Sequence, residues 1–504
     1  MNRILICLLS ILLFTGCKKF LDVRPLDRLS GNAFFQNKED VESAVWDMYG
    51  LMRDKLGSCP FLPASGDMRS GMLRKSAEMG TSRIYFDYIS TNDLLTLLTS
   101  TSGDVMEGTF HWHNLTTWDG FYHAIQAANI IYYEVGRREI PGVSAADVKQ
   151  YQAEAVFMRS LAYFIMIRVW GDVPYYTDAY HEDPLPREPM VDVANKCIAD
   201  LDKVKDDLPW VYADPAYTGV RAGRAAIRAL MMQLNMWNAG FDKAHAKDYY
   251  TRTAALGEEV VKSGQFELLP IEDFNTLFKG RTKESIFEIV QNSNYGEIIM
   301  YQTFSDMVLH FPYKRPASTH HYSFSYFYSE FLQQLYPSGL PDARIDFWFD
   351  KDMLSNDGNF QFLKFTNIYA VSDNEDVNPD EDQIIFRYAG LLLLRAEALA
   401  EIGQNEEAIR MLNMVRSRAK ALPFTDGGNT QALKDAIFAE RAKELMGEGQ
   451  YYYDLIRTGR VMQSQWCANS LTQAQFNARA WTWPLDASVL NQNPYMQLNN
   501  YWVR

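Results

Sequence analysis

The strongest constraint on the fold is a pair of helix-forming segments near the C-terminal side of the chain. Apolar residues recur at helical spacing from Leu391 to Ile402 and again from Glu406 to Lys420, and only a short Gly403-Gln404 turn separates the segments. A lone helix pair cannot bury its apolar face, so pairs of this kind stack against neighbouring pairs. The sequence therefore predicts a scaffold of stacked helix pairs.

Small side chains in this pair indicate the kind of repeat. Ala396 and Ala408 lie where tetratricopeptide repeats need small residues, because their two helices approach closely there. Asn37 is expected to cap an earlier helix. Other stretches with helical periodicity are 118–135, 145–169, 191–208, 224–241, 249–262, 433–446 and 452–462. Together they predict about four helix pairs, divided between residues 118–262 and 388–462.

Residues 284–388 have a different character. Ile286–Val290 is strand-like, and the turn sequence Asn356-Asp357-Gly358-Asn359 lies between the aromatic runs 347–349 and 360–365, which predicts a β-hairpin. We therefore expect a mostly α fold, in which a tetratricopeptide-like helix-pair scaffold carries an irregular α+β insertion.

The N-terminus is typical of an exported protein. Arg3 gives a basic start, Ile4–Phe14 is apolar, and Thr15-Gly16-Cys17 follows. The apolar run is too short to span a bilayer, and no later run is long enough. Small residues before a cysteine resemble the bacterial lipobox, although Phe14 stands where that motif usually has Leu. We predict that residues 1–16 are a lipoprotein signal peptide and that Cys17 carries the lipid anchor.

Charge and cysteine content exclude some classes of protein. The net charge is -14 and no Lys/Arg run supplies a basic face, so we expect no nucleic-acid partner. Beyond Cys17, the cysteines are Cys59, Cys197 and Cys467, which form no C-x-x-C motif and no disulfide framework. One disulfide bridge and three buried free thiols both remain open.

Catalytic and metal motifs are weak. The histidines at 111, 113, 320 and 321 lack a third ligand at motif spacing, and the acidic loop 373–382 lacks the central glycine of an EF-hand. Ser417-x-x-Lys420 lies on a repeat helix, which is the wrong context for a nucleophile. We predict no catalytic residue, no metal and no cofactor. A pair of glycosidase carboxylates stays open, because its spacing is set by the fold.

Several blocks of sequence are similar to those of one family, the SusD/RagB-like proteins of Bacteroidota. The blocks are Cys17–Pro25, Phe34–Asp40, Trp118–Tyr122, Trp170–Pro174, Gly223–Ala226, Arg395–Ala398, Glu440–Gly449, Asp454–Arg457, Trp483–Leu485 and Gln497–Tyr501. Tyr451-Tyr452 departs from the basic residue that is usual after the Glu-Gly step. The resemblance spans the mature chain and divides it into an N-terminal SusD-like region, 17–283, and a C-terminal SusD/RagB-like region, 284–504, each with repeat helix pairs.

The resemblance implies a location and partners. Such proteins lie lipid-anchored on the outer face of the outer membrane, where they cover a SusC-like TonB-dependent transporter. Most capture oligosaccharides and some capture peptides. Their repeat helices chiefly pack against the transporter, while the irregular part carries the ligand face.

Aromatic residues outside the repeats are the candidate ligand contacts, because a glycan site needs flat ring faces and a few polar groups. The residues that we select are Tyr85, Trp112, Tyr295, Tyr313, Arg315 and Tyr322. Trp118, Tyr122, Tyr163 and Trp170 are assigned to packing, because they lie on repeat helices. The leading hypothesis is a non-enzymatic surface protein that binds a glycan. A peptide-binding relative, a glycan hydrolase and a scaffold that binds only protein are the alternatives.

Overall fold

A computed structural model describes residues 34–80, 84–100, 110–291, 303–314, 317–318, 321–354, 360–366 and 381–503. Its long helices are α3 (Lys38–Leu56), α8 (Asp119–Arg137), α9 (Ala145–Trp170), α10 (Met190–Val204), α11 (Arg224–Phe241), α12 (Ala246–Ser263), α16 (Tyr388–Glu401), α17 (Asn405–Arg418), α18 (Thr430–Glu444) and α19 (Tyr451–Thr458). The prediction of a mostly α fold with helix pairs is confirmed.

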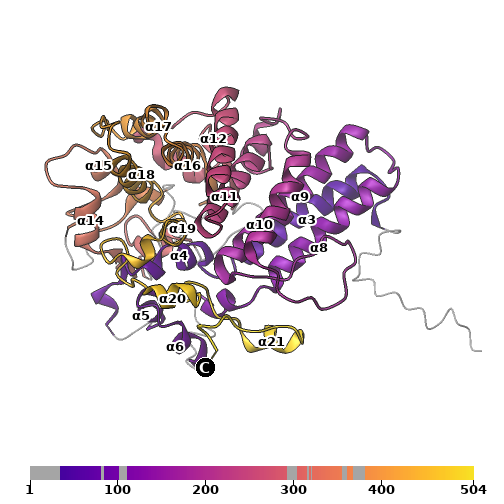
Figure 1. The fold of residues 1–504 in the computed structure, drawn as a ribbon, viewed down its shortest axis with the longest axis horizontal. Helices are drawn as coiled ribbons and strands as arrows, with labels where there is room; N and C mark the ends of the chain where they lie inside the picture. Colours follow the sequence, from indigo (N-terminus) through magenta and orange to yellow (C-terminus); the bar gives the residue numbers. More distant parts are fainter. Residues whose placement is uncertain are drawn as a thin grey trace, which may run out of the picture.

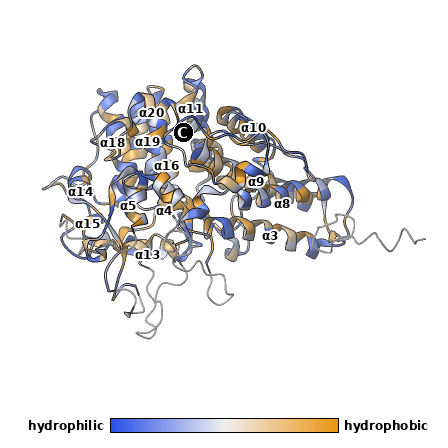
Figure 2. Cartoon of the chain, turned by 90° about the horizontal axis from the view of Figure 1, so that it is seen from below, coloured by the Kyte–Doolittle hydropathy of each residue, from blue (hydrophilic) through white to orange (hydrophobic). Residues whose placement is uncertain are grey.

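The long helices form one continuous array. Helix α3 packs on α8, and each following helix packs on the next, through α9, α10, α11 and α12 to α16, which contacts both α17 and α18. In Figure 1 this array runs from α3, α8 and α9 on the right, past α11 and α12, to α16, α17 and α18 at the upper left. Figure 2 shows the elongated outline from below, with hydrophilic colour on many loops and helix ends.

Local sequence sets several helix ends. The Asn37 side chain accepts the backbone N–H of Asp40, whose carboxylate accepts the N–H of Asn37 in return, and Ser144 and Asp147 repeat this capping box before α9. Gly171 ends α9 with a φ of +76°, a conformation that L side chains rarely adopt. From Ala153 onward α9 is buried on all sides, so it forms the centre of its half of the core.

Short elements lie beside the array. They are α4 (Phe61–Gly66), α5 (Tyr85–Ser90), α6 (Leu94–Thr99), α13 (Ser305–Val308), α14 (Ser329–Leu335), α15 (Arg344–Trp348), α20 (Gln473–Asn477) and α21 (Ala487–Gln492). Two antiparallel two-stranded sheets join distant parts of the chain: β1 (Leu73–Lys75) pairs with β3 (Ser325–Phe327), and β2 (Ser285–Ile289) pairs with β4 (Gln383–Arg387). The predicted strand at 286–290 is therefore present, one residue earlier.

The hairpin prediction was wrong for the segments that the structure describes. Phe347 and Trp348 belong to helix α15, residues 363–365 form a 3-10 helix, and only one antiparallel bridge, Phe349 to Phe362, joins the two runs. The turn sequence that suggested the hairpin lies outside the described residues. The alternation of aromatic residues reflects packing rather than strand pairing, since Trp348 and Phe362 are both in the core.

The C-terminal segment returns to the N-terminal elements. The N–H of Trp483 donates to the carbonyl of Val169 at 2.8 Å, and the N–H of Asp486 donates to Thr116 at 3.0 Å. Gly66 in α4 lies so close to Gly449 that a Cβ atom on Gly66 would stand 2.0 Å from the Gly449 carbonyl oxygen. These contacts make the first and last parts of the described chain a single packed unit.

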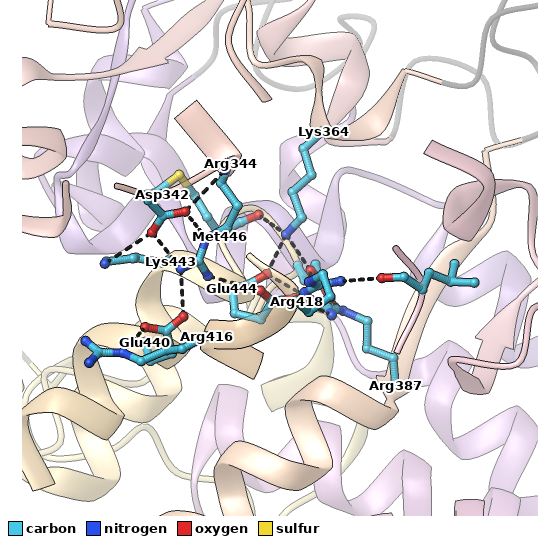
Figure 3. A network of polar contacts seen from close by, with 12 residues as sticks. Asp342, Arg344, Lys364, Arg387, Arg416, Arg418, Glu440, Lys443, Glu444 and Met446 are labelled. Atoms are coloured by element: carbon cyan, nitrogen blue, oxygen red, sulfur yellow. Dashed lines mark hydrogen bonds and ion pairs between the residues drawn. The ribbon is translucent and has the colours of Figure 1, made fainter. Parts of the chain in front are cut away.

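A buried network of charged side chains joins the irregular part to the array (Figure 3). Arg344 at the start of α15 contacts Asp342 at 2.7 Å and, on α18, Glu440 at 2.7 Å and Glu444 at 3.1 Å. Arg387 at the end of β4 contacts Glu444 at 2.7 Å. Each of these ionic side chains is at most 5% exposed, so the charges are compensated by one another rather than by water.

Candidate ligand-binding surface

Two of the predicted ligand contacts are core residues. Tyr85 is 2% exposed and Trp112 is completely buried. Their rings lie 5.5 Å apart in a cluster with Phe86, Phe110 and Phe324. A ring with aromatic neighbours on this scale has no free face for a sugar, so the structure does not support a ligand role for Tyr85 or Trp112.

The other predicted residues divide into two groups. Tyr295 and Arg315 lie outside the described residues, as does Cys17. Tyr313 and Tyr322 are half-buried and pack against the edge of the core. They remain candidates because each keeps part of its ring at the surface.

Tyr313 and Tyr322 are held by two segments that lie side by side. The carbonyl of His310 accepts the N–H of Tyr313 at 2.8 Å. The ring of His310 is hydrogen-bonded through Nδ1 to the hydroxyl of Ser323 at 3.0 Å, next to Tyr322. Tyr322 lies 6.3 Å from Phe324, which packs into the buried cluster. The core therefore supports both tyrosines from behind.

Strand β3 extends this surface. Its pairing sets Arg74 of β1 opposite Tyr326, and the Arg74 guanidinium lies 4.9 Å from the centre of the Tyr328 ring. Arg74 is exposed, whereas Tyr326 and Tyr328 are half-buried. We call Arg74, Tyr313, Tyr322, Tyr326 and Tyr328 the tyrosine face.

Sequence reasoning missed part of the tyrosine face. From Ser325 to Tyr328 buried and half-buried residues alternate, as in a strand, whereas Phe324 before them is buried and does not follow this pattern. That period-2 pattern was the available signal. Arg74 gave no local signal, because only the pairing of β1 with β3 brings it to these tyrosines.

The tyrosine face suits binding better than catalysis. It offers ring surface together with the Arg74 guanidinium and four phenol hydroxyls, which are the groups that read hydroxyl-rich ligands. The nearby Asp87 carboxylate is in an ion pair with Lys75 at 2.6 Å. Among the described residues, no three His, Cys, Asp or Glu side chains gather as metal ligands do.

The remaining sequence candidates have structural explanations or lie outside the described part. Cys59, Cys197 and Cys467 are buried free thiols, which decides between the two alternatives left open. Ser417 and Lys420 mark the end of α17, where Lys420 pairs with Glu272. Of the acidic loop 373–382, residues 373–380 lie outside the described residues. Within the described chain, every helix is too short or too polar to cross a membrane.

Comparison with known proteins places this architecture in a family. The model described as SusD family matches residues 349–502, and the SusD-like model described as starch-binding associating with outer membrane matches residues 67–234. The SusD-like protein P38 of Formosa agariphila is 24% identical over 98% of this chain and 97% of its own length.

Solved structures agree with the sequence matches. A SusD homolog from Bacteroides thetaiotaomicron has a TM-score of 0.85 and 38% identity, covering 93% of this chain and 100% of the other. A laminarin-binding SusD-like protein has the same fold, with a TM-score of 0.70 at 18% identity over 92% of this chain and 99% of its own.

A helix-pair array that carries an irregular α+β part is also the fold of these solved SusD-like structures. Within that fold class, the chain belongs to the SusD family. The expected resemblance is confirmed, and with it the membership of a family associated with the outer membrane.

Proposed function

We propose that this protein is a lipid-anchored surface receptor that captures a glycan at the tyrosine face and does not cleave it. The observation that carries the proposal is the run of half-exposed tyrosines on β3 and its flanks, held rigidly by the buried aromatic cluster. Ring surfaces that are fixed in advance bind sugars with a small loss of conformational entropy. Family members named for starch and laminarin support the class of ligand.

The proposal includes an anchor and a partner. Cys17 is the lipidated residue, and the chain faces outward from the outer membrane. A SusC-like TonB-dependent transporter receives the glycan, with the helix array as the docking scaffold. Replacing Cys17 with Ser should abolish fatty-acid labelling and move the protein from the membrane fraction to the soluble fraction.

Binding can be tested on the chain from residue 18 onward, which contains every described residue. We expect the Tyr322→Ala and Tyr326→Ala variants each to weaken binding to laminarin or starch about two- to tenfold, since an aromatic contact contributes about 0.5–1.5 kcal/mol. Affinity electrophoresis in gels that contain each polysaccharide measures the change. Tyr132→Ala is the matched control, because Tyr132 is 40% exposed on α8, outside the tyrosine face.

Affinity electrophoresis, a reducing-end assay and analysis of co-purified peptides on the same protein together separate the alternatives. New reducing ends during incubation would show a hydrolase and contradict the binding-only proposal. If both tyrosine variants are retarded by the polysaccharide gels as strongly as the unmodified protein, the tyrosine face is not the glycan-binding site. Failure to retain either polysaccharide, together with peptides that co-purify with the protein, would instead indicate a peptide-binding member of the family.

A further inference from the structure

A cleft separate from the tyrosine face lies at one side of the helix array. It has a volume of about 500 Å³ and lies between the start of α8, the connection after α9 and the segment around α21. Its lining includes Trp118, Tyr122, His123, Tyr176, Asp183 and Asn493. We call it the α8 cleft. Its volume is in the range of small-molecule sites.

Parallel rings form one wall of the α8 cleft. The rings of Tyr122 and Tyr176 are 5.9 Å apart at an interplanar angle of 10°, and the ring of His181 stacks on Tyr176 at 4.4 Å and 20°. Trp118 meets Tyr122 edge to face at 5.8 Å. Because the rings of Tyr122, Tyr176 and His181 stack on one another, this wall presents ring edges and polar atoms to the cleft rather than free ring faces.

Hydrogen bonds fix this wall in place. The hydroxyl of Tyr122 donates to the carbonyl of Pro174 at 2.8 Å, and the hydroxyl of Tyr163 accepts the backbone N–H of Tyr176 at 3.0 Å. The ring of His181 is hydrogen-bonded through Nε2 to the carbonyl of Asp183 at 2.6 Å. The connection after α9 is thus tied to α8 and α9, and the cleft exists before any ligand arrives.

Two polar atoms of the wall are unused. In the described part of the chain, neither the indole N–H of Trp118 nor the hydroxyl of Tyr176 makes a hydrogen bond, although the Trp118 residue is only 5% exposed. Burial raises the pKa of Tyr176 to about 12, so its hydroxyl stays a donor at neutral pH. Neither atom is enclosed by the protein, so both can donate to a group that enters the cleft, and an apolar occupant would leave both without an acceptor.

The charges at the rim of the α8 cleft disfavour one class of ligand. Asp119, Glu182 and Asp183 are exposed carboxylates beside the cleft, and they repel anionic ligands. Carboxylates accept hydrogen bonds from hydroxyl groups. A hydroxyl-rich compound without negative charge can accept hydrogen bonds from Trp118 and Tyr176 and donate hydrogen bonds to carboxylates at the rim.

We propose that the α8 cleft is a second saccharide-binding site, which takes one or two neutral sugar units. The inference rests on the proposed function for its class of ligand, but it concerns different residues on a different part of the fold. Two separated sites on one chain would hold a long glycan at two points, and the second contact would form at a high effective concentration.

The test uses the chain from residue 18 onward, labelled with 5-fluorotryptophan. Fluorine NMR resolves signals from its 11 tryptophans, and the Trp118→Phe variant assigns the signal of Trp118. The probes are laminarin oligosaccharides and maltooligosaccharides. We expect the Trp118 signal to shift saturably with one of them, and the shift to persist in Tyr322→Ala. In Tyr176→Phe, which removes only the hydroxyl, the Kd measured at Trp118 should rise about two- to tenfold.

Three results would overturn the proposal. A Trp118 signal that neither probe moves, with binding at the tyrosine face intact, refutes the second site and leaves the proposed function standing. Loss of the Trp118 shift in Tyr322→Ala shows a single site. An absence of binding by every measure removes both proposals. Tyr132→Phe is the matched control for the loss of a hydroxyl, because Tyr132 is 40% exposed on α8 and does not line the α8 cleft.

Discussion

Arg344 and Glu440 form a buried ion pair with 2.7 Å between Nη2 and Oε1, and neither side chain is exposed. The pair joins α15 of the irregular part to α18 of the helix array. Burial by itself would raise the pKa of the neighbouring Glu444, but the surrounding arginines hold it well below its ordinary value. The network therefore stays ionised, and each charge depends on its partners.

Removing one member of this network should be costly. We expect Arg344→Ala to lower the free energy of unfolding by about 3–5 kcal/mol, because it removes the central cation of the buried network and leaves Asp342 with Lys443 alone and Glu440 with Arg416 alone. Urea denaturation followed by circular dichroism measures the loss. Arg410→Ala is the matched control, since its pair with Glu407 is at the surface and should contribute less than about 1 kcal/mol. Equal losses in both variants would contradict this account.

Stability should fall as the pH rises from about 4 to about 7, in part because of Asp67. Burial raises the pKa of Asp67 to about 7, while its carboxylate accepts the N–H of Gly449 at 2.7 Å. The folded protein therefore holds a proton that the unfolded chain has already released, so the contribution is present at low pH and is lost as the pH approaches 7.

Asp67→Asn removes this titration. The fall in melting temperature between pH 5 and pH 8 should be smaller in Asp67→Asn than in the unmodified chain, whereas Asp47→Asn, at an exposed carboxylate, should leave it unchanged. Differential scanning calorimetry across the pH range gives the comparison. Parallel curves for all three proteins would show that Asp67 is not the group responsible.

Two glycines should respond in opposite ways to alanine. Gly66→Ala would force apart two backbone segments, because its Cβ would overlap the carbonyl of Gly449, and we expect a loss of about 1–3 kcal/mol or more. Gly50 lies inside α3 with nothing near its missing Cβ, so Gly50→Ala should stabilise the protein by about 0.5–1 kcal/mol. A lower melting temperature for Gly66→Ala and a higher one for Gly50→Ala would verify both predictions. An unchanged melting temperature for Gly66→Ala would contradict the close approach of Gly66 to Gly449.

The three described thiols should be inert in the native protein. Burial raises the pKa of Cys59, Cys197 and Cys467 to about 12, and only the thiolate is a good nucleophile. In the chain from residue 18 onward, iodoacetamide should label none of them at pH 8 and all of them after unfolding in guanidinium. Mass spectrometry locates the label; rapid native labelling of any one would show that its site opens.

The sequence was sufficient for the long helices of the array and insufficient for the ligand surface, for a physical reason. Helical periodicity is a local property, and the stretch 224–241 coincides with α11 at both ends. An aromatic residue that packs in a core and one that contacts a ligand can stand in similar local sequence, so local sequence does not distinguish them. Trp112 is enclosed by Tyr85 and Phe86 from another segment, whereas Tyr322 stays half-buried, and only the folded structure separates the two.

The same limit applies to the error at 347–349. Phe347 and Trp348 read as a strand by composition, but α15 begins at Arg344, which is held by carboxylates about a hundred residues further along the chain, at Glu440 and Glu444. Such a tertiary contact overrides local preference, and no local pattern announces it.

The return of the C-terminal segment to α4 and α9 also bears on how the molecule is made. A chain emerges from the ribosome with its N-terminus first, yet Val169 and Thr116 receive their partners Trp483 and Asp486 only near the end of synthesis. The C-terminal end of α9 and the segment at Thr116 therefore lack these partners through most of translation. The segment around Trp483 and Asp486 therefore completes the packing of Val169 and Thr116 only after the intervening three hundred or so residues have been synthesised.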